Sequence, residues 1–152
     1  MGRSITEIED AIIDALKRSR LGLYCTKIAS FQFQGADEEE EIRLMAKSLP
    51  CVLVVYKGAE YTSLQMCADR RMTFWILAAS SSLREVGESR RGPHGTYELL
   101  DDIRETLTGS RVGLSDIDPL LPLREEALVN ARGFSAYYIE FRTKARYAFA
   151  DQ

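Results

Sequence analysis

The C-terminal residues 135–152 alternate between uncharged and charged positions over an unusual length. A two-residue period is typical of a β-strand that turns one face to a core and the other to water. About fifteen such residues would span about 50 Å, whereas a domain of 152 residues has a diameter of only about 40 Å. The strand must therefore bend or leave the domain, and an apolar face that leaves it needs a second chain to cover it. The uncharged positions are Ser135, Tyr137, Ile139, Phe141, Thr143, Ala145, Tyr147 and Phe149, and the charged ones are Glu140, Arg142, Lys144 and Arg146.

Hydrophobic residues at helical spacing predict three helices, at about 5–18, 37–47 and 96–107. The first is the most strongly marked, because Ser4 and Glu7 form an S-x-x-E capping box in front of apolar residues three and four positions apart. The second opens with consecutive carboxylates over 37–41, which would spread around a helix start rather than converge on a pocket. The third is followed by Gly109, which suits a C-cap.

Short apolar or alternating runs predict five strands, at 24–33, 51–56, 72–79, 123–129 and 134–141. The second and third are typical of central strands covered on both faces, and Gly58 is expected to end the first of this pair. The last two form a hairpin around a turn that contains Gly133. Residues 83–95 predict a polar surface loop, and residues 114–122 an extended connector.

This order of elements predicts an α+β fold with a mixed or antiparallel sheet, helices packed mainly on one side, a C-terminal hairpin and an extended arm. The length fits a single domain over 1–152, in which 143–152 is a candidate assembly arm.

The net charge of -3 argues against a whole-protein affinity for nucleic acid or an anionic membrane. The first residues lack the apolar segment of a signal peptide, and no apolar run is long enough for a membrane span, so we expect a cytoplasmic protein.

Candidate catalytic chemistry is sparse. The single histidine, His94, lies in a Gly-Pro loop without the rigid frame that a Ser-His or Cys-His pair needs, although Ser80 or Ser82 could supply a nucleophile. The three cysteines lack the spacing of a zinc site or redox motif and are expected to be free thiols, most of them buried. No phosphate-binding glycine motif occurs. We therefore expect no enzyme activity, no cofactor and no metal site.

Several segments together resemble the tail terminator family of Mu-like contractile-tailed phages and prophages. These segments are the first helix at 5–12, the runs at 49–55 and 72–78, the arginine-rich 90–92, the stretch at 95–104 and the final strand at 137–141. The resemblance covers nearly the whole chain, and its ordered set of segments carries it, since no single motif is specific.

The resemblance implies a structural protein that caps a finished tail tube, fixes tail length and offers the docking surface for the head. Such proteins typically form a hexameric ring, so the implied partners are further copies of the chain, tube and sheath proteins and a head-neck protein. The implied locations are the host cytoplasm during assembly and then the virion tail. No catalytic residue carries over. Another head-tail joining component, a small enzyme and a nucleic-acid-binding module are the alternatives.

The patterning and the implied ring together suggest interface residues. We expect residues 135–141 to complete the chain's own sheet, while Ala145, Tyr147 and Phe149 pack on a neighbouring subunit. Between these apolar positions, the cations of the same strand would face polar surface. The alternatives are a frayed terminus or a strand that bends back on its own sheet. The polar loop at 83–95 is a second candidate surface. The candidate interface cations of this loop are Arg84, Arg90 and Arg91, and those of the C-terminal strand are Arg142, Lys144 and Arg146.

Overall fold

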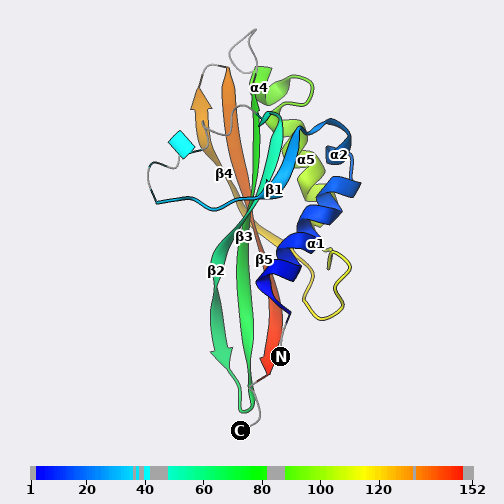
Figure 1. The fold of residues 1–152 in the computed structure, drawn as a ribbon, viewed down its shortest axis with the longest axis vertical. Coiled ribbons are helices and arrows are strands. Elements are labelled where there is room, and N and C mark those ends of the chain that lie inside the picture. The colour runs from blue at the N-terminus through cyan, green and yellow to red at the C-terminus, as the bar shows by residue number, and fades with distance from the viewer. Residues whose placement is uncertain are drawn as a thin grey trace.

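The computed structural model describes residues 3–35, 37, 40–41, 48–81, 88–131 and 133–148. Two helices come first along the described chain, followed by three strands, two further helices and a final pair of strands (Figure 1). The helices are α1 (Ile5–Arg18), α2 (Leu21–Tyr24), α4 (Glu88–Arg91) and α5 (Thr96–Leu107), and the strands are β1 (Lys27–Ser30), β2 (Cys51–Ser63), β3 (Cys67–Ser81), β4 (Leu121–Ala131) and β5 (Phe134–Ala148).

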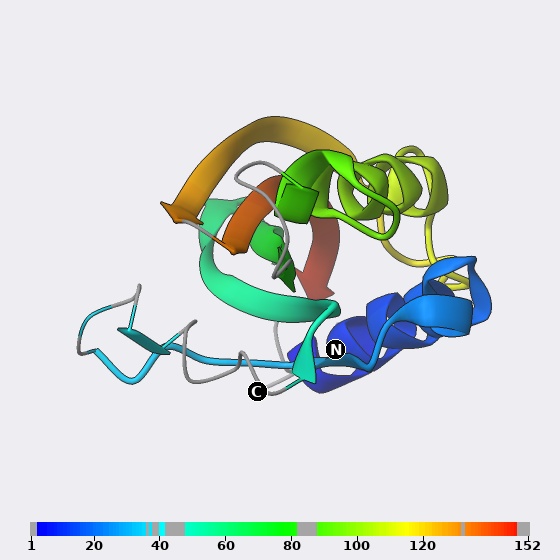
Figure 2. The same ribbon diagram turned by 90° about the horizontal axis from the view of Figure 1, so that it is seen from above.

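The strands form one five-stranded sheet in the order β1-β2-β3-β5-β4. β1 runs parallel to β2, and the other neighbours are antiparallel. Figure 2 shows the sheet curling, with α1 and α5 together on one side of it. The predicted α+β class with a mixed sheet and a C-terminal hairpin is therefore confirmed.

The core between the helices and the sheet explains why α1 and α5 form where the pattern predicts them. Ile8, Ile12 and Leu16 of α1 are fully buried against Met72 and other sheet residues. At the start of α1, the Ser4 hydroxyl accepts a hydrogen bond from the Glu7 backbone at 3.1 Å, and the Glu7 carboxylate accepts from the Ser4 backbone at 3.3 Å. This reciprocal pairing confirms the capping box and satisfies two otherwise unpaired backbone donors.

The opposite face of the sheet holds a second core. Leu53, Val55 and Leu77 belong to it and are almost completely buried. Because successive side chains of a strand point to opposite faces, the apolar runs of β2 and β3 supply both cores at once. This is the physical reason why these runs lack polar alternation in the body of the domain, as expected for central strands.

The expected end of β2 at Gly58 is wrong. The strand bulges between Tyr56 and Gly58, where Gly58 has φ +130°, and then continues to Ser63, opposite Ala68 of β3. A glycine that can adopt this conformation lets the strand kink and resume its pairing. β3 begins at Cys67, earlier than expected, and β5 continues past Phe141 to Ala148.

These longer strands create a three-stranded distal extension, made of residues 58–63, 67–72 and 143–148. β3 is its middle strand, with β2 on one side and β5 on the other. Figure 1 shows the hairpin of β2 and β3 and the end of β5 reaching well beyond the helices. The excess length of the C-terminal strand is thus used in pairing with β3.

Other expected boundaries also change. Tyr24 ends the short helix α2, and β1 covers only Lys27–Ser30, so the expected strand at 24–33 is mostly wrong. β4 begins at Leu121 and includes Pro122, which an edge strand tolerates because its outer amides need no ladder partner. The expected loop at 83–95 contains α4, while 82–87 lies outside the described residues. Most of the expected helix at 37–47 also lies outside them.

Candidate assembly surface

Residues 143–148 of β5, the described part of the candidate assembly arm, pair with the chain's own β3. Ala145 lies opposite Arg70 and forms an isolated bridge with Ile117 of the connector, and only 3% of its surface is exposed. The expectation that Ala145 packs on a neighbouring subunit is therefore corrected, because its own chain already covers it. The connector backbone also donates from Asp118 to the Lys144 carbonyl at 2.8 Å.

The distal extension ends in exposed apolar side chains, which we call the apolar tip. Tyr61 and Tyr147 lie on one face, because their partners Arg70 and Ala68 are two positions apart on β3. Tyr61 is 59% exposed and Tyr147 38%. The apolar tip consists of Tyr61, Leu64, Met66 and Tyr147. Of the apolar arm residues expected to meet a neighbour, Tyr147 is therefore available, while Phe149 lies outside the described residues.

The cations of β5 lie on the other face of the distal extension. Arg146 and Lys144 approach the carboxylate of Asp69 at 3.4 Å and 3.9 Å, and Lys144 also lies 3.8 Å from Asp118. Arg142 is exposed and forms no ion pair with any residue that the structure describes. The three cations thus do not behave alike, because Arg142 retains a charge that no carboxylate of the described chain offsets.

Arg142 belongs to a groove between β3, β5 and the start of β4, which we call the basic groove. Arg71 and Lys144 supply its other cations, and Asp118 supplies one carboxylate. Leu121 and Leu123 line the same groove and are 57% and 46% exposed. An exposed apolar wall beside unpaired cations is typical of a surface that contacts another protein.

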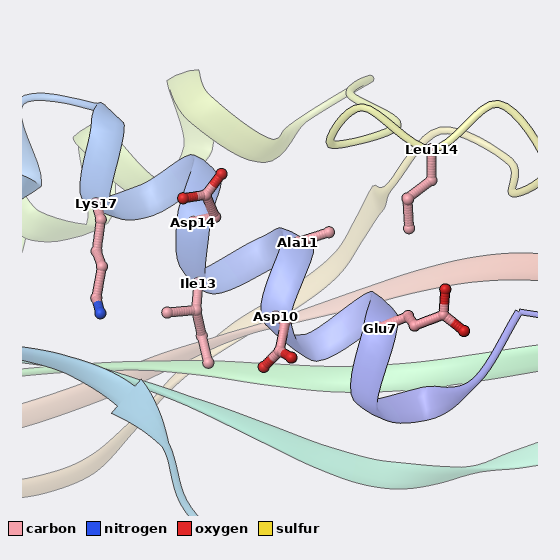
Figure 3. Close-up of a pocket in the computed structure, with 7 residues that line it drawn as sticks. All are labelled: Glu7, Asp10, Ala11, Ile13, Asp14, Lys17 and Leu114. Carbon is pink, nitrogen blue, oxygen red and sulfur yellow. The ribbon is translucent and has the colours of Figure 1, made fainter.

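A second shallow groove runs along the solvent side of α1, and we call it the acidic flank. Its charged residues are Glu7, Asp10, Asp14 and Lys17, beside Ala11, Ile13 and Leu114. Figure 3 shows Leu114 of the connector pointing toward α1, with Glu7 and Ala11 on that side and Asp10 and Ile13 on the other.

Two carboxylates of the acidic flank already have partners. Arg3 binds Glu7 at 2.8 Å, and this contact is the main reason why the pKa of Glu7 is lowered. Arg18 binds Asp14 at 2.8 Å. Asp10 forms no ion pair within the described part of the chain, so its charge remains available.

The arginines of the polar loop are not near the other candidates. Arg90 and Arg91 end α4, which lies at the opposite end of the sheet from the apolar tip (Figure 1). Arg91 is exposed, whereas Arg90 is half-buried. Arg84 lies outside the described residues. The structure therefore separates the described interface candidates into two distant groups (Figure 1), and the group on β5 adjoins a groove.

Ser80 and His94, the candidate catalytic residues that the structure describes, form no nucleophile-base pair. The Ser80 hydroxyl donates to the main-chain carbonyl of His94 at 3.0 Å, and the imidazole stacks on Tyr24 with ring centroids 4.2 Å apart. Ser82 lies outside the described residues. The His94 backbone amide also donates to the Glu98 carboxylate at 2.6 Å. None of these contacts directs a ring nitrogen at a nucleophile, as a general base would require.

The described residues contain no cluster of three potential metal ligands from His, Cys, Asp and Glu. Cys25, Cys51 and Cys67 are free, as expected, but only Cys51 is buried, so the expectation that most of them are buried is wrong. None of the described helices is both long and apolar enough to cross a membrane.

Two features of this surface were not anticipated from sequence. Most of the apolar tip lies between the strands predicted at 51–56 and 72–79, where Ala59, Tyr61 and Ser63 alternate with polar residues and indicate that the strand continues. The basic groove was overlooked because its cations come from strands far apart in sequence. The available signal was the pair Leu121 and Leu123 next to the charged run 124–126.

The curled mixed sheet with helices on one side places the chain in the α+β class, and a solved structure shares this fold. A chain of the solved structure "Virion of native gene transfer agent (GTA) particle" is similar to it with a TM-score of 0.60 and 16% sequence identity, over 91% of this chain and 94% of that chain. At this identity the similarity shows a shared fold. Comparison with curated protein sequences finds no match.

The particular family follows from the sequence. Residues 4–146 match the family model described as Bacteriophage Mu, Gp37. Because the match covers most of the chain, the protein belongs to this family. The expected relationship to a Mu-like phage family is therefore confirmed.

Proposed function

We propose that the protein is a non-enzymatic structural component of a phage tail. It forms a ring on the end of the tail tube, fixes the length of the tail and provides the surface to which the head joins. Six subunits is the number that the family resemblance implies. The partners are further copies of the chain, the tube and sheath proteins and a head-neck protein. Assembly takes place in the host cytoplasm, and the finished ring remains in the virion tail.

A structural role in a virion is supported by the membership of a bacteriophage family and by the fold shared with a chain of a virion particle. The observation that carries the proposal is the distal extension, which continues the sheet beyond the helices (Figure 1) and ends in the apolar tip. Exposed apolar side chains at the end of a projecting sheet favour contact with another protein over solvation.

The shape of the distal extension suits a cap better than a pocket enzyme. Its three strands pair with one another, so paired strands hold Tyr61 and Tyr147 of the apolar tip, while Leu64 and Met66 lie in the short turn that joins β2 to β3. A rigid projection of this kind can reach across to the adjacent ring of a tube, where a fixed geometry is needed for stacking.

Deletion of the gene in the phage or prophage that carries it tests the proposal. We expect tail tubes of unregulated length that fail to join heads, seen by electron microscopy, and restoration by the gene supplied in trans. Finished tails of normal length without heads would instead favour the alternative, another head-tail joining component. Normal particles in the deletion strain would contradict both functions.

A further inference from the structure

We propose that the basic groove of one subunit receives the acidic flank of α1 of the next subunit, so that the ring closes through a head-to-tail contact. This inference rests on the proposed function, because it identifies the surfaces through which the proposed ring would form. The occupant of the basic groove is thus a second copy of the chain.

The charges of the two surfaces are complementary. The basic groove carries three cations and one carboxylate, whereas the acidic flank carries three carboxylates and one lysine. Arg71 and Arg142 form no ion pair within the described residues, and neither does Asp10. Opposite charges that lack partners within the chain can pair between chains, and such pairing fixes register and orientation at an interface.

The apolar parts of the two surfaces are also suited to each other. Leu121 and Leu123 stand exposed beside the cations of the basic groove. On the acidic flank, Ala11 and Ile13 of α1 lie partly exposed beside the carboxylates, with Leu114 of the connector at its border. A contact that brings the charges together would therefore also remove apolar surface from water. This burial of apolar surface adds a favourable contribution to association beyond that of the charge pairs.

The two surfaces lie on opposite sides of the sheet. Met72 and Phe141 point into the core that α1 covers. Arg71 and Arg142 are their immediate neighbours in sequence, so these cations point to the other face, away from α1. The acidic flank lies on the solvent side of α1, and it therefore faces away from the sheet, in the direction opposite to the basic groove. Two different patches that face in opposite directions generate a ring or filament, whereas a two-fold dimer would need one patch to meet itself.

Charge reversal with mixing of variants tests this contact by sedimentation velocity on the full chain. Asp10→Arg and Arg142→Glu should each weaken self-association about tenfold or more, because like charges then face each other. An equimolar mixture of the two variants should assemble again, since Arg at position 10 of one meets Glu at position 142 of the other. The double variant D10R/R142E should also assemble alone. Raising the salt concentration should weaken assembly of the wild type.

The matched control is Glu105→Arg, which reverses an exposed carboxylate on α5 without touching either groove. It should assemble like the wild type. Circular dichroism and thermal melting of every variant separate a folding defect from an interface defect, and rescue in the mixture requires both variants to be folded.

The outcomes distinguish this contact from the proposed function. Single variants that assemble like the wild type, or a mixture and a double variant that both stay dissociated, would overturn the contact. A wild-type chain that stays monomeric while Arg142→Glu loses its place in particles would mean that the groove binds a different virion protein, which also overturns it. In each case the deletion phenotype would still decide whether the protein caps tails.

Discussion

The hydroxyl of Tyr24 donates a hydrogen bond to Oδ2 of Asp102 at 2.5 Å, although 78 positions separate the two residues. Asp102 is only 5% exposed, and Arg20 approaches its other oxygen at 3.4 Å. The contact joins α2 to α5 and gives a buried carboxylate two partners. Burial, and then the bond to Asp102, raise the pKa of Tyr24.

Tyr24→Phe removes one of these partners. We expect the free energy of unfolding to fall by about 2 kcal/mol, because a hydrogen bond to a buried charged group is lost. Urea unfolding measures the change. Tyr97→Phe is the matched control, because Tyr97 is exposed on the neighbouring helix, and equal losses in both variants would contradict a special role for the Asp102 contact.

The buried thiol of Cys51 predicts a dependence of stability on alkaline pH. Burial raises its pKa to about 11, so the native state favours the neutral thiol. This contribution to stability is complete below the ordinary thiol pKa and is lost as the pH rises through about 11. The free energy of unfolding should therefore decline less steeply between pH 9 and pH 11, both approximate limits, in Cys51→Ala than in the wild type. Parallel declines in the two proteins would contradict the assignment.

Gly58 is expected to control the distal extension. Its φ of +130° is unfavourable for any other residue, although a Cβ there would meet no atom within 4 Å. Gly58→Ala should therefore cost about 1–3 kcal/mol through backbone strain alone. Hydrogen exchange should show faster exchange in residues 59–63 while α1 and α5 stay protected. Unchanged protection in that segment would show that the bulge tolerates a side chain.

The apolar tip makes a prediction about assembly without unfolding. Replacement of Tyr61 and Met66 by serine should reduce incorporation of the protein into particles severalfold, because apolar contact area is lost. The melting temperature should hardly change, since both side chains are exposed. Leu23→Ser is the matched control, because Leu23 is 86% exposed on α2, away from the tip. Equal incorporation of the tip variant and the control would contradict a role for the tip.

The longer helices α1 and α5 could be predicted from sequence almost to the residue, because their signals are local, whereas the one-turn helices α2 and α4 were not predicted. The capping pair Ser4 and Glu7 and the apolar spacing of α1 act within a few residues of each other. Strand ends could not be predicted in the same way. Whether β2 stops at Gly58 or continues depends on a partner strand, and β3 supplies that partner to Ser63.

The candidate surface was predictable only in part. The alternation of β5 correctly indicated one buried and one charged face, but it could not identify what covers the buried face, and for Ala145 the cover is the connector at Ile117. The basic groove depends on β3 and β4 lying on either side of β5. Sequence spacing carries no information on that arrangement, so Arg71 and Leu121 could not be grouped with Arg142.

The continuity of β3 has a mechanical consequence. This strand runs from Cys67 in the distal extension to Ser81 in the body, and it pairs with β2 and β5 along nearly its whole length. In antiparallel ladders the hydrogen bonds lie perpendicular to the strands. A pull along the long axis would therefore load many of these bonds together in shear, instead of opening them one at a time. The extension thus resists being drawn out of the domain.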